Sequence, residues 1–251
     1  MKLTVTSIAL CLAIAPLALA EEGDRPNCTG LPTAAQLKAH LNNLNAVPVA
    51  LGGSGGKIGG LFNGARMWAA VVNREGQVCA VASSTSDPTQ VWPGSQAIAK
   101  SKAYTANAFS IDSLALSTAK LYTFTQPGHS LWSLGQSNPF EPQQLATPAD
   151  PGKSNGKLAG GLIFFGGGVP LYTTAGKIVG GLGVSGDTSC ADHEVAKRVR
   201  QLAALNPVGG ATADDISYSA PDGFSAFTHP QCIGTYRNGV FIGDEAPAKG
   251  Y

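Results

Sequence analysis

The segment 166–205 constrains the fold more than any other part of the sequence. It contains Gly166-Gly-Gly-Val-Pro-Leu-Tyr172 and Lys177-Ile-Val-Gly-Gly-Leu-Gly-Val-Ser-Gly-Asp187, and it runs into a helix-like stretch from Cys190 to Leu205. Glycine permits tight turns and close backbone approach, and the first amides of a helix can bind an anion. The segment therefore predicts a strand that turns sharply into a helix, with backbone amides at the turn.

Two catalytic or cofactor motifs can be tested against this segment. Gly181-Leu-Gly-Val-Ser-Gly186 satisfies G-x-G-x-x-G, but a dinucleotide fold needs a further strand ending in an acidic residue about 20 positions on. Position 206 is Asn, and the residues after it are not a buried strand. The esterase elbow G-x-S-x-G fails too, because Asp187 stands where its second glycine belongs. Any ligand contact made by this turn is expected to come from its backbone.

The N-terminus has the pattern of a secretory signal. Lys2 precedes an apolar run over 8–19, and Ala18 and Ala20 are followed by acidic residues. We predict a signal peptide of residues 1–20, cleaved after Ala20, and a periplasmic or secreted protein. No later window reaches the roughly 20 apolar residues of a membrane span, so the mature form is not expected to be membrane-embedded. A formal net charge of +1 makes nucleic acid an unexpected partner.

Four cysteines remain after removal of the signal peptide. An even number in an exported chain favours two disulfides, and no pair has the C-x-x-C spacing typical of zinc sites. We expect Cys190 to pair with Cys232 and Cys28 with Cys79.

Hydrophobic periodicity and turn residues predict a helix, a hairpin, two helices, two further strands and a final helix. Their expected ranges are 33–45, 67–73 with 77–83, 95–109, 113–122, 162–165 with 177–184, and 190–205, the last helix being capped by Ser189. This order implies a mixed α+β fold on a largely antiparallel sheet.

Three segments carry little periodicity. The glycine-rich stretch 51–64 is expected to be a flexible surface loop. The proline-rich stretch 125–155 has the length of a binding loop or lid. The Gly/Pro-rich residues 211–251 form an expected C-terminal extension tied down by a disulfide.

Four histidines are present. His129 lies in the proline-rich loop near Trp132, and His193 lies in the first turn of the final helix. Each is a candidate axial ligand for haem iron, although each position also suits a surface or capping role. His40 and His229 are expected to be solvated. The sequence contains no H-x-x-x-H motif, no C-x-x-C-H motif and no paired carboxylate cluster, so no such motif supports a metal site.

One family resemblance emerges from these motifs. Gly167-Gly-Val-Pro-Leu-Tyr172, Gly180-Gly-Leu-Gly-Val-Ser-Gly186 and Asp192 resemble the GlcG/HbpS haem-binding family, whose domain also ends PduO proteins and is known as a haem-degrading domain. Val71-Val-Asn-Arg-Glu-Gly76 and Lys102-Ala-Tyr-Thr-Ala106 look like the hairpin turn and central helix of that family.

The resemblance implies a domain over 21–210, built on a profilin-like antiparallel sheet of about five strands flanked by helices and often assembled into homo-oligomers. It implies haem, or another small molecule, as the ligand. Two departures affect the expected pocket charge: Asn73 replaces the usual Asp, and Ser83-Ser-Thr85 lacks the usual Arg. The candidate cofactor-binding residues are His129, His193, Trp132, Tyr172, Gly167, Gly168 and Ser185, with the two histidines as metal ligands.

Three functions follow from this reasoning. The first is an exported haem-binding protein for haem scavenging, buffering or sensing. The second is an enzyme that degrades haem or acts on a small organic acid, although the sequence shows no acid–base pair. The third is a non-catalytic sensor or accessory module for a small metabolite.

Overall fold

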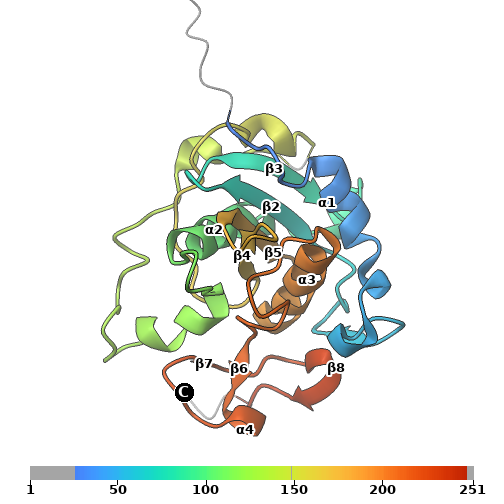
Figure 1. Cartoon of the computed structure of the whole chain (residues 1–251), viewed down its shortest axis with the longest axis vertical. Helices are drawn as coiled ribbons and strands as arrows, with labels where there is room; N and C mark the ends of the chain where they lie inside the picture. Colours follow the sequence, from blue (N-terminus) through green and yellow to red (C-terminus); the bar gives the residue numbers. More distant parts are fainter. Residues whose placement is uncertain (1–25, 148, 248–251) are drawn as a thin grey trace, which may run out of the picture.

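The computed structural model describes residues 26–147 and 149–247, so the predicted signal peptide of residues 1–20 lies outside them. The centre of the fold is a four-stranded antiparallel sheet with the order β3-β2-β5-β4 (Figure 1). Its strands are β2 (Trp68–Asn73), β3 (Val78–Ser83), β4 (Gly168–Tyr172) and β5 (Ile178–Ser185). This confirms the α+β class and the antiparallel sheet, with four strands in the central sheet where about five were expected.

Helices cover both faces of the sheet. Alternate residues of a strand point to opposite faces, and β2 shows this clearly. Ala69 and Val71 pack with α1 (Ala34–Leu41) and α3 (Ser189–Leu202), whereas Ala70 and its neighbours pack against α2 (Ser95–Ala108). The sheet is therefore the middle layer of three.

The glycines of β5 allow α2 to lie directly on the strand. A Cβ atom at Gly181 would lie 2.1 Å from the carbonyl oxygen of Ala103, and one at Gly183 would lie 1.9 Å from that of Ala99. At Gly186, where φ is +155°, a Cβ atom would lie 2.0 Å from the carbonyl oxygen of Arg66. The G-x-G-x-x-G spacing thus serves backbone packing.

The start of α3 is capped differently from the prediction. Ser189 is the first helical residue, and the hydroxyl of Thr188 accepts a hydrogen bond from the N–H of Ala191. The Asp187 carboxylate accepts hydrogen bonds from the N–H groups of Leu61 and Phe62, at 2.6 and 2.7 Å. These bonds hold the glycine-rich segment against the helix start.

The expectation of a flexible surface loop over 51–64 was wrong. Residues 51–53 are buried, and β1 (Lys57–Gly59) pairs antiparallel with the tail strand β8 (Thr235–Gly243). The sequence offers no sign of this pairing because the two strands are far apart along the chain. The tail also contains β6 (Ser217–Tyr218), α4 (Ser219–Asp222) and β7 (Thr228–His229), which lie with β8 at one end of the molecule (Figure 1).

Two other local predictions were wrong. The helix expected over 113–122 is reduced to the 3₁₀ turn η4 (Thr118–Leu121), because the Ser110 hydroxyl bonds both the N–H and the C=O of Leu116 and turns the chain beforehand. No strand forms over 162–165, and β4 begins only at Gly168. The remaining 3₁₀ turns are η1 (Leu44–Ala46), η2 (Val49–Leu51), η3 (Pro88–Gln90), η5 (Thr123–Thr125), η6 (Pro142–Gln144) and η7 (Pro151–Ser154).

Covalent and charged contacts fasten the tail to α3. Cys190 is bonded to Cys232 and Cys28 to Cys79, the pairing expected from the sequence. The buried Lys197 ammonium contacts the carboxylates of Glu194 and Asp215 at 2.6 and 2.7 Å, and the side-chain oxygen of Asn238 at 2.9 Å. The tail therefore shares buried polar contacts with α3, while the predicted boundary at residue 210 stays a prediction. Within the described ranges, no helix is long and apolar enough to cross a membrane.

Candidate functional site

A cleft of about 730 Å³ lies between the proline-rich loop and the tail, and we call it the loop–tail cleft. The loop side contributes Tyr122, Thr123 and His129. The tail side is mixed in character: Phe224 is apolar, Asp244 and Glu245 are acidic, and the other lining residues are Ser219, Ser225, Thr228, His229, Pro230, Gln231 and Ala246. The cleft is thus lined by a histidine that was predicted as a ligand and by residues of the C-terminal tail, for which no helix or strand was predicted.

His129 is held in a turn that leaves its ring exposed. Its backbone N–H donates to the carbonyl oxygen of Gln126 at 3.1 Å, and its own carbonyl oxygen accepts from the N–H of Trp132 at 3.1 Å. Its side chain is exposed. The Trp132 side chain is 55% exposed and lies on the same turn outside the cleft lining. Of the predicted ligand residues, His129 alone lines the loop–tail cleft.

His229 forms part of the cleft wall and corrects our expectation of a solvated residue. It is buried, its Nδ1 lies 2.7 Å from the carbonyl oxygen of Pro230, and its Nε2 accepts from the N–H of Gly166 at 3.2 Å. Burial lowers the pKa of His229 to about 4, so the ring is neutral near pH 7. The position of His229 only three residues before Cys232 was the one sequence signal that its side chain is anchored.

His193 lies inside the fold. Its side chain is fully buried, and its Nε2 lies 3.4 Å from an oxygen of Asp215. A Cβ atom at Gly166 would be 3.1 Å from the Cβ of His193. The glycine turn, residues 166–168, therefore covers His193. The structure does not bring His193 and His129 to one cavity, and iron binding by His193 would require its ring to leave this position.

The other candidate residues make structural contacts. The Tyr172 hydroxyl donates to the carbonyl oxygens of Ile111 and Leu114. Ser185 is buried and pairs with Trp68 across the sheet. Gly168 donates its N–H to the hydroxyl of Thr118 at 2.9 Å. None of these side chains or glycines lines the loop–tail cleft.

Gly167 leaves room for a buried ion pair. The Lys102 ammonium lies 2.7 Å from the Asp192 carboxylate, and both side chains are almost wholly buried. A Cβ atom at Gly167 would lie 2.7 Å from that ammonium. Burial raises the pKa of Asp192 to about 6, against the opposing effect of Lys102, and it lowers the pKa of Lys102. Gly167 and Asp192, both part of the family resemblance, thus meet at a structural ion pair.

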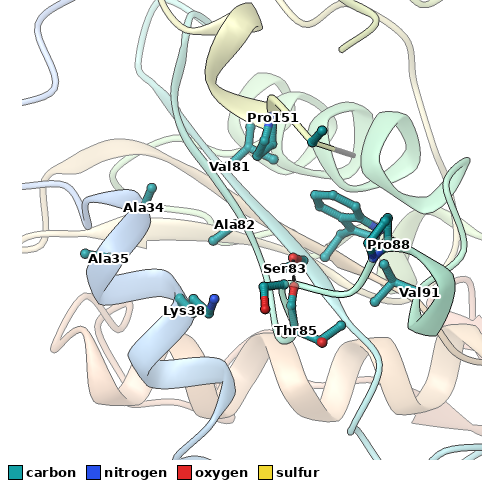
Figure 2. A pocket seen from close by; sticks show the side chains of 13 residues that line it. Ala34, Ala35, Lys38, Val81, Ala82, Ser83, Thr85, Pro88, Val91 and Pro151 are labelled. Carbon is teal, nitrogen blue, oxygen red and sulfur yellow. Dashed lines mark hydrogen bonds between the residues drawn. The ribbon is translucent and has the colours of Figure 1, made fainter. Parts of the chain in front are cut away.

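A second cavity of about 370 Å³ lies beside the edge strand β3 (Figure 2). Lys38 from α1 is its charged lining residue, Ser83 and Thr85 supply hydroxyl groups, and Ala34 and Pro88 supply exposed apolar surface, while the Trp68 indole is fully buried beneath them. The indole N–H already donates to the carbonyl oxygen of Trp92 at 3.1 Å. This β3 cavity contains no histidine, so it suits a small anion better than a metal.

A sequence model described as haem degrading protein HbpS-like matches residues 60–201. The chain belongs to the HbpS-like family. The match includes the central sheet, α2, most of α3 and the loop that carries His129, and it ends before the tail. The tail side of the loop–tail cleft therefore lies outside the region that defines the family.

Several solved structures resemble the chain at low identity. PduOC in complex with haem is 21% identical, with 69% of this chain and 93% of that chain covered and a TM-score of 0.46. Klebsiella pneumoniae protein ORFY is 22% identical, with 68% and 88% covered and a TM-score of 0.44. A double mutant of Streptomyces reticuli HbpS is 23% identical, with 76% and 98% covered and a TM-score of 0.38. No curated protein matches the chain.

Proposed function

We propose that this protein binds haem in the loop–tail cleft, with His129 as the ligand to iron. The observation that carries the proposal is an exposed histidine lining a cleft of about 730 Å³ in a chain of the HbpS-like family. Cofactor sites have volumes of roughly 300–1,000 Å³, and neutral imidazole is a common ligand of haem iron.

The chemistry of the lining fits a porphyrin in one orientation. Tyr122 and Phe224 offer aromatic surface, and the Phe224 side chain is 91% exposed. Asp244 and Glu245 also line the cleft and would repel the two propionates of haem. The propionates are therefore expected to point into solvent, away from the acidic end of the tail.

The residues of this chain would bind and orient the group. His129 would hold the iron from the loop, and the neutral His229 would form an uncharged part of the wall. Bound haem would supply redox and small-ligand chemistry at its iron. Binding by both segments would also connect the family domain to the tail, as expected for a protein that buffers or senses haem.

Hemin titration followed in the Soret region tests the proposal. We expect a shifted Soret band for the wild type and at least tenfold weaker binding for His129→Ala. His40→Ala is the matched control, because His40 is half-buried and does not line the cleft. The assignment is overturned if the wild type gives no shift, if His129→Ala binds normally, or if His40→Ala is the variant that loses binding.

Haem degradation is the enzymatic alternative within the same family. Incubation of the hemin-loaded protein with a reductant separates the two, since degradation opens the porphyrin ring and releases iron. Recovery of intact porphyrin supports a binding, buffering or sensing role.

The β3 cavity favours a second candidate, the binding of a small organic acid. Lys38 provides the cation and Pro88 the apolar contact for a small carboxylate. A thermal-shift screen of small carboxylates, with Lys38→Met as the comparison, tests it: a ligand that stabilises the wild type alone supports this candidate. A screen with no stabilising compound removes it.

A periplasmic or secreted location is proposed on the signal-like sequence and the two disulfides, since disulfides persist in oxidising compartments. Assembly into a homo-oligomer is proposed from the family resemblance. N-terminal sequencing of the exported protein and light scattering of the purified protein test the two proposals separately.

A further inference from the structure

Cys190, Cys232 and His229 form a cluster of metal-ligand side chains where α3 meets the tail. One ligand atom of each residue lies within 4.8 Å of those of the others, and all three residues are buried. The two sulfurs are bonded to each other. The cluster can therefore bind a metal only after this disulfide is reduced.

The hydrogen bonds of His229 fix the tautomer that a metal ligand needs. Because Nε2 accepts the N–H of Gly166, the ring proton is on Nδ1, where it donates to the carbonyl oxygen of Pro230 at 2.7 Å. Metal-binding histidines usually donate their second ring N–H to a carbonyl or carboxylate in this way. The Nε2 lone pair now accepts the N–H of Gly166 at 3.2 Å, so a metal bound at Nε2 would replace this one hydrogen bond.

The sulfur of Cys232 lies among donors at the start of α3. The backbone N–H of Cys190 donates to it at 3.2 Å, and the Ser189 hydroxyl oxygen lies 3.3 Å away. Such donors, together with the positive end of the helix dipole, stabilise negative charge on a sulfur. A thiolate formed by reduction is therefore stabilised at the position where a metal would need it.

We propose that reduction of the Cys190–Cys232 disulfide creates a binding site for one soft d¹⁰ cation, Zn²⁺ or Cu⁺, held by two thiolates and the Nε2 of His229. An external dithiol supplies two electrons and two protons and closes to its own disulfide, while the Cys190–Cys232 S–S bond breaks to give two thiols. The cation then displaces the two thiol protons as the sulfurs bind it.

The ligand set determines this choice of cation. Thiolate and imidazole favour Zn²⁺ and Cu⁺ over Mg²⁺ or Ca²⁺, which prefer oxygen. The sulfurs must separate so that each lies about 2.3 Å from the metal, and Cys232 lies in the connection between β7 and β8, outside any helix or strand. Of the three ligand residues, His229 lines the loop–tail cleft, so a cation from solvent would approach the site from that side.

Metal titration of the phosphine-reduced protein under anaerobic conditions, in the absence of haem, tests this proposal. Co²⁺ serves as the spectroscopic probe for Zn²⁺ through its thiolate charge-transfer absorption, and competition with a chromophoric chelator measures Cu⁺. We expect one equivalent to bind to the reduced wild type and none to the oxidised protein. His229→Ala should bind at least tenfold more weakly.

Matched variants keep the test decisive. Cys28→Ser/Cys79→Ser removes the other disulfide and should keep the site, and His129→Ala should bind metal like the wild type even if it loses haem. Circular dichroism of each reduced protein checks that it is folded, and if Cys190→Ser/Cys232→Ser does not fold, His229→Gln is used in its place. The proposal is overturned by a reduced wild type that binds no metal, or by equal binding after loss of Cys190 and Cys232 or of His229.

Discussion

Replacing Gly183 by alanine tests why the glycine pattern of β5 exists. The added Cβ atom would lie 1.9 Å from the carbonyl oxygen of Ala99 and 2.5 Å from the amide nitrogen of Ala103. Both are backbone atoms of α2, so no side-chain rotation can relieve the contact. Overpacking of a core costs about 1–3 kcal/mol, and we expect Gly183→Ala to fall at the upper end, about 3 kcal/mol.

Thermal and urea unfolding of the variant measure this cost. For a domain of this size, each kcal/mol lowers Tm by about 2–4 °C, so we expect Tm to fall by about 6–12 °C. Gly94→Ala is the matched control, because a Cβ atom there meets nothing within 4 Å and the backbone is already helical, with φ −65° and ψ −27°. The same chemical change should therefore stabilise the protein at position 94, by about 0.4–1 kcal/mol.

Equal unfolding free energies for the two variants, within about 0.5 kcal/mol, would refute the packing explanation. The strand and helix would then be able to separate at little cost. A large loss at position 183 with normal haem binding would show that the glycine is needed for the fold and not for ligand contact.

Three further predictions concern buried polar and covalent contacts. Lys102→Ala should destabilise the protein by about 3–5 kcal/mol in urea unfolding because it leaves Asp192 buried and unpaired, whereas Lys102→Met combined with Asp192→Leu should cost less; an equal cost contradicts this. The lowered pKa of His229 means that the unfolded chain binds a proton more readily, so stability should be lost as pH falls from 6.5 to about 4, by up to about 3 kcal/mol. The free energy of unfolding of His229→Gln should therefore fall less between pH 7 and pH 4 than that of the wild type. An equal fall in the two proteins would rule out His229 as the cause. Cys190→Ser/Cys232→Ser should lower the free energy of unfolding by about 4 kcal/mol, given a sequence separation of 42 residues, and a change below about 1 kcal/mol would contradict it.

The sequence predicts those elements whose signal is local. The hairpin of β2 and β3, the helix α2, the strand β5 and the helix α3 all appear close to their expected ranges, because periodicity and turn residues determine them. The apolar run 162–165 satisfies the same local rule but finds no strand partner: Ile163 donates its N–H to the hydroxyl of Thr105 instead. Strand formation depends on a neighbouring strand, which periodicity does not reveal.

The sequence likewise predicts only one part of the candidate site. His129 was identified from its loop and neighbouring aromatic residue, and it lines the cleft. The cleft itself, and the burial of His229 beside Gly166, depend on the tail folding back onto the glycine turn. The nearby Cys232, predicted to pair with Cys190, indicates that this part of the tail is anchored, but it does not indicate the contact of His229 with Gly166. Composition alone made the tail look irregular, although β8 extends over Thr235–Gly243.

The pairing of β1 with β8 sets a condition on the order of events when the chain folds. Lys57 lies opposite Gly239, so a chain that emerges N-terminus first cannot complete this pair until β8 has emerged. Until then, Glu194 lacks the N–H of Asn238 and Lys197 lacks its side-chain oxygen. Contacts between distant segments form slowly. The nascent chain should therefore complete its folding only after β8 has emerged, and a truncation that removes β8 should slow or arrest folding.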